Sequence, residues 1–193
     1  MPTATRMLAL DPDVVVAGTF LAPATRAAFE RLGIRVETVA IASTIAESEA
    51  QVAQLARLAG YPEHGAALNA RIDAALATAR WTGAKVSTLV WQEGGIVPGE
   101  QSLIAGLLAN AGFASHSAAR GLGQGAHLPL EQVLADPPAL VLATSDERML
   151  THPALRHLAG TRYARLESSL LWCGGPTIIR AADRLAQVRR EIG

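Results

Sequence analysis

Short apolar runs alternate along the chain with segments whose apolar residues recur at helical spacing. The runs at Val14–Ala17 and Leu140–Ala143 have the continuous Val, Leu and Ala content that is typical of parallel strands covered on both faces. Further strands are predicted at 34–39, 86–91 and 163–166, and the main helices at 23–32, 44–59, 62–80, 101–111 and 178–192. This alternation predicts an α/β fold with mainly parallel strands and helices on both faces of the sheet.

One stretch of this pattern occurs twice. The pattern of Met7–Gly18 occurs again at Val133–Thr144. Each copy predicts the end of a helix, a proline that terminates it, and a buried strand. The matched prolines, Pro12 and Pro138, lie 126 residues apart. Two copies predict two similar lobes. Because the first copy begins almost at Met1, the first lobe is predicted to lack most of its N-terminal part.

The segment between the two predicted lobes is helical. Thr44-Ile45-Ala46-Glu47 has capping-box spacing, and the stripe Leu68, Ile72, Leu76 and Ala79 lies on a helix that runs from Pro62 to about Arg80. At a rise of about 1.5 Å per residue this helix spans roughly 28 Å, which is enough to cross a domain boundary. We therefore predict a partial lobe at residues 1–43, a helical linker at 44–82 and an α/β lobe at 83–193.

The amino-acid composition argues against some classes of function. The chain has 193 residues, half of them hydrophobic, and its 17 basic residues balance 17 acidic ones. With no run of Lys or Arg, nothing predicts a nucleic acid partner. No apolar stretch is long enough for a membrane span, and the opening residues do not resemble a signal peptide. Cys173 is the only cysteine and has no histidine close in sequence, so we expect a small buried thiol rather than a nucleophile.

Several further motifs occur in a fixed order. They are Leu10–Val14, Gly95-x-x-x-Gly99 followed by Ser102-Leu103, Leu107-Leu108-x-x-Ala111-Gly112, Leu130-Glu131-x-x-Leu134, His152–Leu155 and Leu171-Trp172-x-Gly174-Gly175-Pro176. Together they resemble the periplasmic substrate-binding proteins of ABC importers for cobalamin and ferric siderophores, the helical-backbone family. The resemblance implies two Rossmann-like lobes joined by a long backbone helix, with the N-terminal lobe incomplete here. It also implies a periplasmic location and a transport role without catalysis.

In this family the ligand lies between the lobes. The resemblance also implies that the ligand is a bulky metal chelate: a corrinoid, a ferric siderophore or haem. The loop that leaves the strand at Trp91, with Gln92, Glu93, Gly94 and Gly95, is one candidate contact, because ligands bind at the carboxyl ends of parallel strands. It could equally be an ordinary strand-to-helix loop.

A second candidate loop holds Trp172, Cys173 and Gly174, where the indole could stack on a flat chelate or instead seal the last helix onto the sheet. If haem is the ligand, His116 and His127 are the histidines that could contact it. None of the five histidines has the spacing of a helical metal site, and we expect His152, ahead of Pro153, to end or cap a helix.

The resemblance also implies partners. Each lobe of the family carries a surface glutamate that docks into an arginine pocket of the permease. Glu131 matches the glutamate of the C-terminal lobe, whereas the repeat places Thr5 at the N-terminal counterpart, where no charge is available. An exposed apolar edge on the incomplete lobe further predicts a homodimer.

Two other classes of function remain open at this point. One is an enzyme on a chelatase-like α/β scaffold, which would need titratable groups that converge in one pocket. The other is a degenerate interaction module that no longer takes part in transport. Gly121-x-Gly123-x-Gly125 lacks the spacing and the strand-to-helix context of a nucleotide cradle, and we interpret it as a turn.

Overall fold

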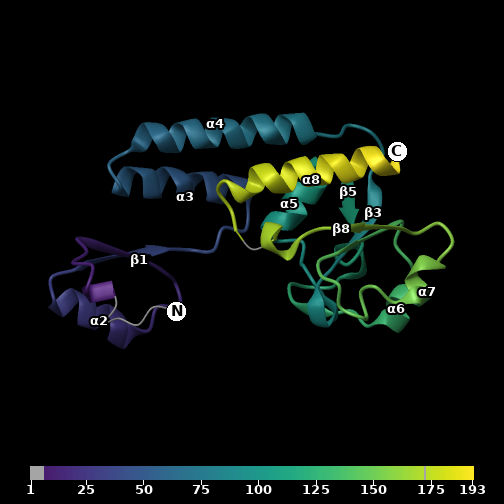
Figure 1. The fold of residues 1–193 in the computed structure, drawn as a ribbon, viewed down its shortest axis with the longest axis horizontal. Coiled ribbons are helices and arrows are strands. Elements are labelled where there is room, and N and C mark those ends of the chain that lie inside the picture. Colours follow the sequence, from purple (N-terminus) through teal and green to yellow (C-terminus); the bar gives the residue numbers. More distant parts are fainter. Residues whose placement is uncertain (1–6, 172) are drawn as a thin grey trace. The chain divides into compact units, whose positions relative to one another are not determined.

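The computed structural model describes residues 7–171 and 173–193, and the chain divides into two compact units. Unit 1 ends at Ile41 and unit 2 begins at Ala42. The strands of the two units belong to different sheets, as the repeat predicts (Figure 1). The division falls close to the predicted lobe boundary at residue 43, and both helices of the predicted linker lie in unit 2.

Unit 1 is a small βαβ unit. Strands β1 (Val14–Gly18) and β2 (Arg35–Val39) pair in parallel and are connected by helix α2 (Pro23–Arg31). Pro23 starts the helix at a position where a missing N–H costs nothing. Among residues 7–41 of this unit, the buried apolar side chains are Val15 and Phe29. Unit 1 therefore has a very small core for its two strands.

Unit 2 holds the remaining elements. Its larger helices and strands are α3 (Ile45–Leu58), α4 (Pro62–Ala79), β3 (Val86–Trp91), α5 (Leu103–Asn110), β7 (Leu140–Ala143), β8 (Arg162–Arg165) and α8 (Thr177–Ile192). Its shorter ones are η1 (Glu93–Gly95), β4 (Ile96–Val97), β5 (Phe113–Ser115), η2 (Ala118–Arg120), β6 (Ala126–His127), α6 (Leu130–Ala135), α7 (Pro153–Arg156) and η3 (Ser168–Leu170).

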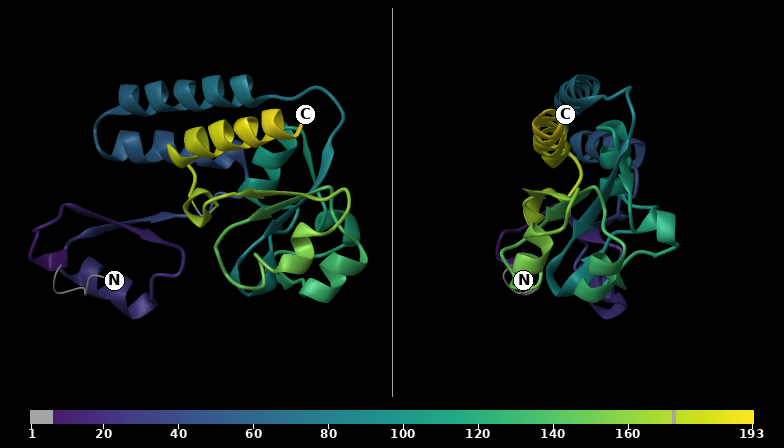
Figure 2. Two further views of the ribbon diagram at one scale, coloured as in Figure 1. Left: turned by 45° about the vertical axis from the view of Figure 1, so that its right-hand side comes forward. Right: turned by 90° about the vertical axis from the view of Figure 1, so that its right-hand side faces the viewer.

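The main sheet of unit 2 has the strand order β5-β3-β7-β8, with every pair parallel. Side chains alternate across it, so that Val90 joins a core with α4, α5 and α8, while Leu89 and Trp91 join a second core with α6 and α7. Figures 1 and 2 show these two groups of helices on opposite faces of the sheet. The prediction of a parallel sheet covered on both faces is confirmed.

Helices α3 and α4 form an antiparallel pair, and α4 also packs lengthwise against α8 (Figure 2). The capping box at Thr44 and Glu47 is present as predicted. The α3–α4 contact is close, because a Cβ atom added at Gly65 would lie 2.5 Å from the Cβ of Ala56. Ile72 on the predicted apolar stripe of α4 is fully buried. The predicted long helix therefore exists, and from Leu68 onward it packs into the core of unit 2.

A carboxyl pair lies between α3 and α4. Burial, together with the nearby carboxyl group of Asp73, raises the pKa of Glu49 above its ordinary value of 4.5. When both carboxyl groups are deprotonated, Glu49 and Asp73 cannot share a hydrogen bond, because neither carries a hydrogen. The Oε1 atom of Glu49 is buried and has no hydrogen-bond partner. The folded state therefore holds the Glu49 proton more tightly than the unfolded chain.

We expect Glu49→Gln to stabilise the protein at neutral pH. A raised pKa contributes stability that is fully present below pH 4.5 and is lost as the pH rises through the folded-state pKa. The amide donates to Asp73 at any pH, so the variant should have the higher melting temperature at pH 7, and the gap should shrink towards pH 4. Melting curves across this range test the prediction, and a gap that does not change with pH would contradict it.

Candidate functional site

Three loops leave the carboxyl ends of neighbouring strands in unit 2. They follow β3 (residues 92–95), β7 (144–149) and β8 (166–176, with residue 172 outside the described part), and we call them the edge loops. Their first residues continue the sheet, because the amide of Thr144 donates to the Trp91 carbonyl at 3.1 Å and that of Leu166 to the Ala143 carbonyl at 2.9 Å. Ligands of open α/β sheets bind at this end of the strands. The edge loops are therefore the candidate ligand-binding surface.

The first two edge loops are joined by a hydrogen bond. The amide of Gly94 donates to Oε2 of Glu147 at 2.7 Å. Gly94 and Gly95 both have positive φ angles, 71° and 77°. A Cβ atom at Gly95 would lie 3.0 Å from the side chains of His127 and Met149. Glycine at both positions thus lets the loop after β3 close onto the loop after β7.

The third edge loop is held by the first turn of α3. The amide of Gly175 donates to Oγ of Ser48 at 2.7 Å, and Ser48 is fully buried. A Cβ atom at Gly174 would overlap this hydroxyl. The loop therefore needs glycine at residue 174 and the Ser48 hydroxyl beneath it.

The structure corrects two sequence-based predictions. Trp91 is fully buried in the second core, and its indole Nε1 donates to the Leu128 carbonyl at 3.0 Å, so the ring cannot stack on a ligand in this conformation. Cys173 is exposed, contrary to the expected buried thiol, because it lies in the loop before α8 and not in an element of the core.

The other predicted contact residues are distributed across the edge loops. Glu93 and Gly94 are exposed, Gln92 is 7% exposed, and Gly174 is half-buried. Trp172 and Thr5 lie outside the described residues. His116 is buried beside the Ser87 hydroxyl, whereas His127 is exposed next to the loop after β3. His152 caps α7 by accepting from the Ala154 amide at 3.2 Å, as predicted.

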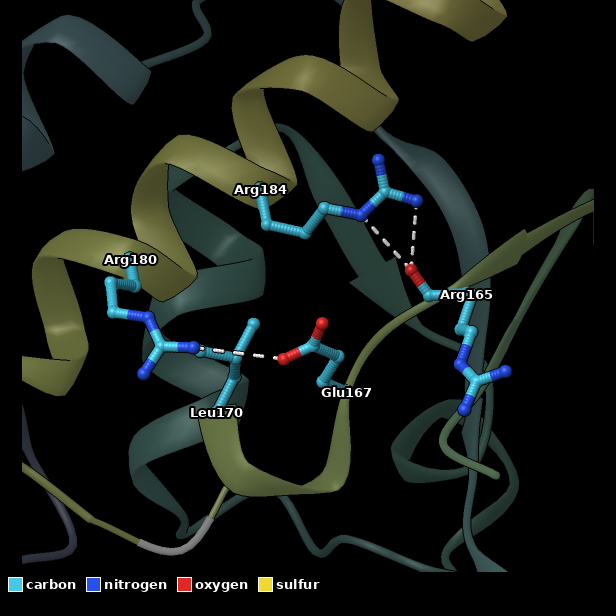
Figure 3. Close-up of a pocket in the computed structure, with 5 residues that line it drawn as sticks. All are labelled: Arg165, Glu167, Leu170, Arg180 and Arg184. Carbon is cyan, nitrogen blue, oxygen red and sulfur yellow. Dashed lines mark hydrogen bonds and ion pairs between the residues drawn. The ribbon is translucent and has the colours of Figure 1, made fainter. Parts of the chain in front are cut away.

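A charged cavity of about 350 Å³ lies where the loop after β8 meets α8 (Figure 3). Arg184 donates through Nε and Nη2 to the carbonyl of Arg165 at 3.0 and 2.9 Å, and Arg180 approaches Glu167 at 3.6 Å. The side chain of Arg165 turns away to Asp146, which raises the pKa of the guanidinium. Arg184 thus ties the end of β8 to α8, and Arg180 adds positive charge beside the loop after β8.

A second depression, of about 480 Å³, surrounds Glu131. Glu131 is exposed in the first turn of α6, and Glu147, Arg148 and His152 line the same depression. The depression is lined by both acidic and basic side chains, and Glu131 is exposed to solvent within it. Glu147 therefore belongs both to the Glu131 depression and to the edge loops, because its carboxylate also accepts a hydrogen bond from the Gly94 amide.

The residues that hold these loops together were not predicted from the sequence. Glu147 and Asp146 follow a predicted strand and could have been found from the rule that ligands bind at carboxyl ends. Ser48 gives no such signal, because it lies 127 residues from its partner Gly175. Arg180 and Arg184 appear in the sequence as the polar side of an amphipathic helix.

Two further observations concern the described part of the chain alone. Among residues 7–171 and 173–193, no cluster of three or more His, Cys, Asp or Glu side chains is arranged to hold a metal ion. In that same part, every helix is too short or too polar to cross a membrane.

Two α/β units, each with its own parallel sheet, place the chain in the class of two-unit α/β proteins. The chain belongs to the periplasmic binding protein family, whose sequence pattern matches residues 3–165. Among curated proteins, no sequence relative matches.

Solved structures resemble the fold over nearly the whole chain. The periplasmic heme-binding protein RhuT from Roseiflexus sp. RS-1 is 22% identical with a TM-score of 0.81, covering 100% of this chain and 81% of RhuT. The periplasmic heme-binding protein HutB of Vibrio cholerae is 18% identical with a TM-score of 0.78, covering 97% and 80%. The periplasmic vitamin B12 binding protein BtuF of Vibrio cholerae is 15% identical with a TM-score of 0.74, covering 97% and 78%.

Proposed function

We propose that the protein binds a bulky metal chelate at the edge loops of unit 2 and acts, without catalysis, as the periplasmic substrate-binding component of an ABC importer. The ligand class is haem, a corrinoid or a ferric siderophore. The observation that carries the proposal is the family match over residues 3–165, and the likeness to structures described as heme- and vitamin B12-binding proteins supports the ligand class.

The chemistry of the edge loops suits such a ligand. Glu93 and Gly94 are exposed, and because Gly94 has no side chain a ligand can approach its backbone closely, while its amide is already bonded to Glu147. The contact Gly94–Glu147 joins the loops after β3 and β7, and Gly175–Ser48 holds the loop after β8, so the loops are ordered before any ligand arrives and the ordering cost of binding falls. A rigid polar rim of this kind orients a large, flat or globular chelate by its periphery.

Haem is the first ligand to test. Two of the three structures compared above are described as heme-binding proteins, and they have the two higher TM-scores. His127 is exposed beside Gly95, where an imidazole nitrogen can serve as an axial ligand to haem iron. His127 lies in β6, and its Nε2 atom would be 3.0 Å from a Cβ atom placed at Gly95 of the loop after β3.

Titration of the purified protein with haemin, cyanocobalamin and a ferric hydroxamate siderophore tests the proposal. Isothermal calorimetry and the visible spectrum of each chelate should show saturable one-to-one binding for one of the three, with Kd on the order of micromolar, about −8 kcal/mol. A folded protein that binds none of the three saturably would overturn the proposal. The degenerate interaction module would then be the better account.

Docking to the permease is part of the proposal, and it assigns Glu131 as the docking carboxylate. Glu131→Ala should weaken the complex with an importer that accepts the same chelate by about tenfold or more, because a charge-assisted contact contributes about 1.5–3 kcal/mol. Chelate affinity should not change. Binding of the loaded protein to the importer in nanodiscs measures the effect, with Glu63→Ala, an exposed carboxylate on α4, as the matched control. Equal losses for both variants would contradict the role of Glu131.

A further inference from the structure

Two side chains that can bind a metal meet beside the second glycine of the loop after β3. A Cβ atom at Gly95 would lie 3.0 Å from Nε2 of His127 and 3.0 Å from Cε of Met149. Because both atoms lie so close to one point, they cannot be farther apart than twice this distance. The Met149 sulfur is bonded directly to that Cε atom. An imidazole nitrogen and a thioether sulfur therefore come together at Gly95.

The fold fixes the backbone on both sides of this pair. Strands β4 and β6 pair with Ile96 opposite His127, and the amide of Leu128 donates to the Gly95 carbonyl at 2.8 Å. Met149 packs against the second core of unit 2. The unbranched side chain of methionine can still turn its sulfur towards an ion, because three of its bonds rotate. The pair is thus held in position while its donor atoms keep the freedom to bind.

An ion can reach the pair from solvent. His127 is exposed, and Met149 lines the depression around Glu131. Metal bonds to nitrogen and sulfur are about 2.0–2.3 Å long, shorter than the 3.0 Å contacts that a Cβ atom at Gly95 would make. The space between the two donors therefore suits an ion better than a side chain at residue 95.

The donor types select the metal. Imidazole nitrogen suits zinc, copper, iron and nickel, whereas thioether sulfur favours soft ions such as Cu(I). Zinc takes four ligands in its structural sites, usually with thiolates or carboxylates among them. Among residues 7–171 and 173–193, no cluster of three or more His, Cys, Asp or Glu side chains is arranged to complete such a set. A nitrogen and sulfur pair of neutral donors therefore fits Cu(I) best.

We propose that His127 and Met149 form a Cu(I) site beside Gly95, with Nε2 and the thioether sulfur as ligands. The carbonyl oxygen of Leu128 is equally close to the Gly95 Cβ position, but it already accepts from the indole of Trp91. The protein thus supplies two ligands and leaves the exposed side of the ion to a ligand from solution. This site binds the ion alone and does not rest on the proposed chelate function.

Anaerobic titration with Cu(I) tests the proposal in a Cys173→Ser background, which removes the exposed thiol that also binds copper. The folded protein should take one equivalent of Cu(I) from its coloured complex with ferrozine. Met149→Leu, which conserves the side-chain volume, and His127→Gln should each weaken Cu(I) binding by at least about tenfold. Met7→Leu and His64→Gln, which remove a methionine and a histidine elsewhere, are the matched controls and should bind as before.

A pair of glycine variants tests the geometry of the site. Gly94 and Gly95 have φ angles of 71° and 77°, so alanine strains the backbone similarly at either position. Gly95→Ala places a methyl group against both ligands and should abolish Cu(I) binding. Gly94→Ala, where no atom lies within 4 Å of the added Cβ, should retain it. Circular dichroism of each variant shows that the fold is kept.

X-ray absorption at the copper edge identifies the ligands. The Cu(I) protein in the Cys173→Ser background should show a sulfur neighbour that disappears in Met149→Leu. Undiminished binding by Met149→Leu or by His127→Gln, or a folded protein that takes up no Cu(I), would overturn the proposal. A protein that binds a chelate and no Cu(I) rejects this site alone. A protein that binds Cu(I) and none of the three chelates rejects the proposed function alone.

Discussion

Replacing Trp91 by alanine should lower the free energy of unfolding by about 3–5 kcal/mol, which is the range for emptying a fully buried aromatic site. The indole is 0% exposed, packs with Leu89 and Val141 in the second core, and donates to the Leu128 carbonyl. The alanine variant leaves both a cavity and an unpaired buried carbonyl. Chemical denaturation followed by circular dichroism measures the loss.

Trp91→Phe separates packing from ligand contact. Phenylalanine keeps most of the buried surface and loses the hydrogen bond, so we expect a smaller loss of about 1–3 kcal/mol. Chelate affinity should stay within twofold of the wild type, because the ring does not reach the surface of the edge loops. If Trp91→Phe left stability unchanged but strongly weakened chelate binding, Trp91 would be a ligand contact, which contradicts the role described here.

Gly174→Ala should have the second-largest effect, and it should act on binding. The added Cβ overlaps the Ser48 hydroxyl, so the loop must move and release the hydrogen bond from Gly175. We expect a loss of about 1–3 kcal/mol in stability, the cost of leaving a buried polar group without its partner. Because the loop is no longer held in place before binding, chelate affinity should fall by about tenfold. Calorimetric titration and thermal melting measure the two effects.

Two further variants serve as controls for that prediction. Gly123→Ala adds the same methyl group where no atom lies within 4 Å, and it should change neither stability nor affinity. Ser48→Ala removes the hydrogen bond but leaves room for the loop, so its loss of affinity should be smaller than that of Gly174→Ala. If Gly174→Ala behaves like Gly123→Ala, the loop after β8 is not fixed in the way described.

Much of the fold follows from local pattern in the sequence. The apolar runs at 14–17 and 140–143 became parallel strands, and the Thr44 capping box began α3 as predicted. Strand β7 is buried throughout, whereas in β1 only Val15 is buried and Val16 is 45% exposed. Short elements were missed, because β5 and the β4–β6 pair have only two or three residues each and show no period. A pattern needs several residues before its periodicity can be distinguished from chance.

The site was harder to predict, for reasons that Trp91 illustrates. Its place at the carboxyl end of a strand was predicted, but with both faces of the sheet covered, either direction of the side chain leads into a core. The prediction that Cys173 is buried was wrong, because it followed the usual burial of cysteine, whereas this cysteine is exposed in the loop before α8. Contacts such as Ser48–Gly175 join residues far apart in sequence, and no local pattern encodes them.

Hydrogen–deuterium exchange with and without saturating haemin tests the central claim most directly. The account predicts that the bound chelate slows exchange at residues 92–95, 144–149 and 173–175 of the edge loops, while the amides of α4 and α6 exchange as before. The same experiment with cyanocobalamin shows whether another chelate uses the same loops. Saturable binding that protects none of these loops, or that protects a different part of unit 2, would contradict the proposed site.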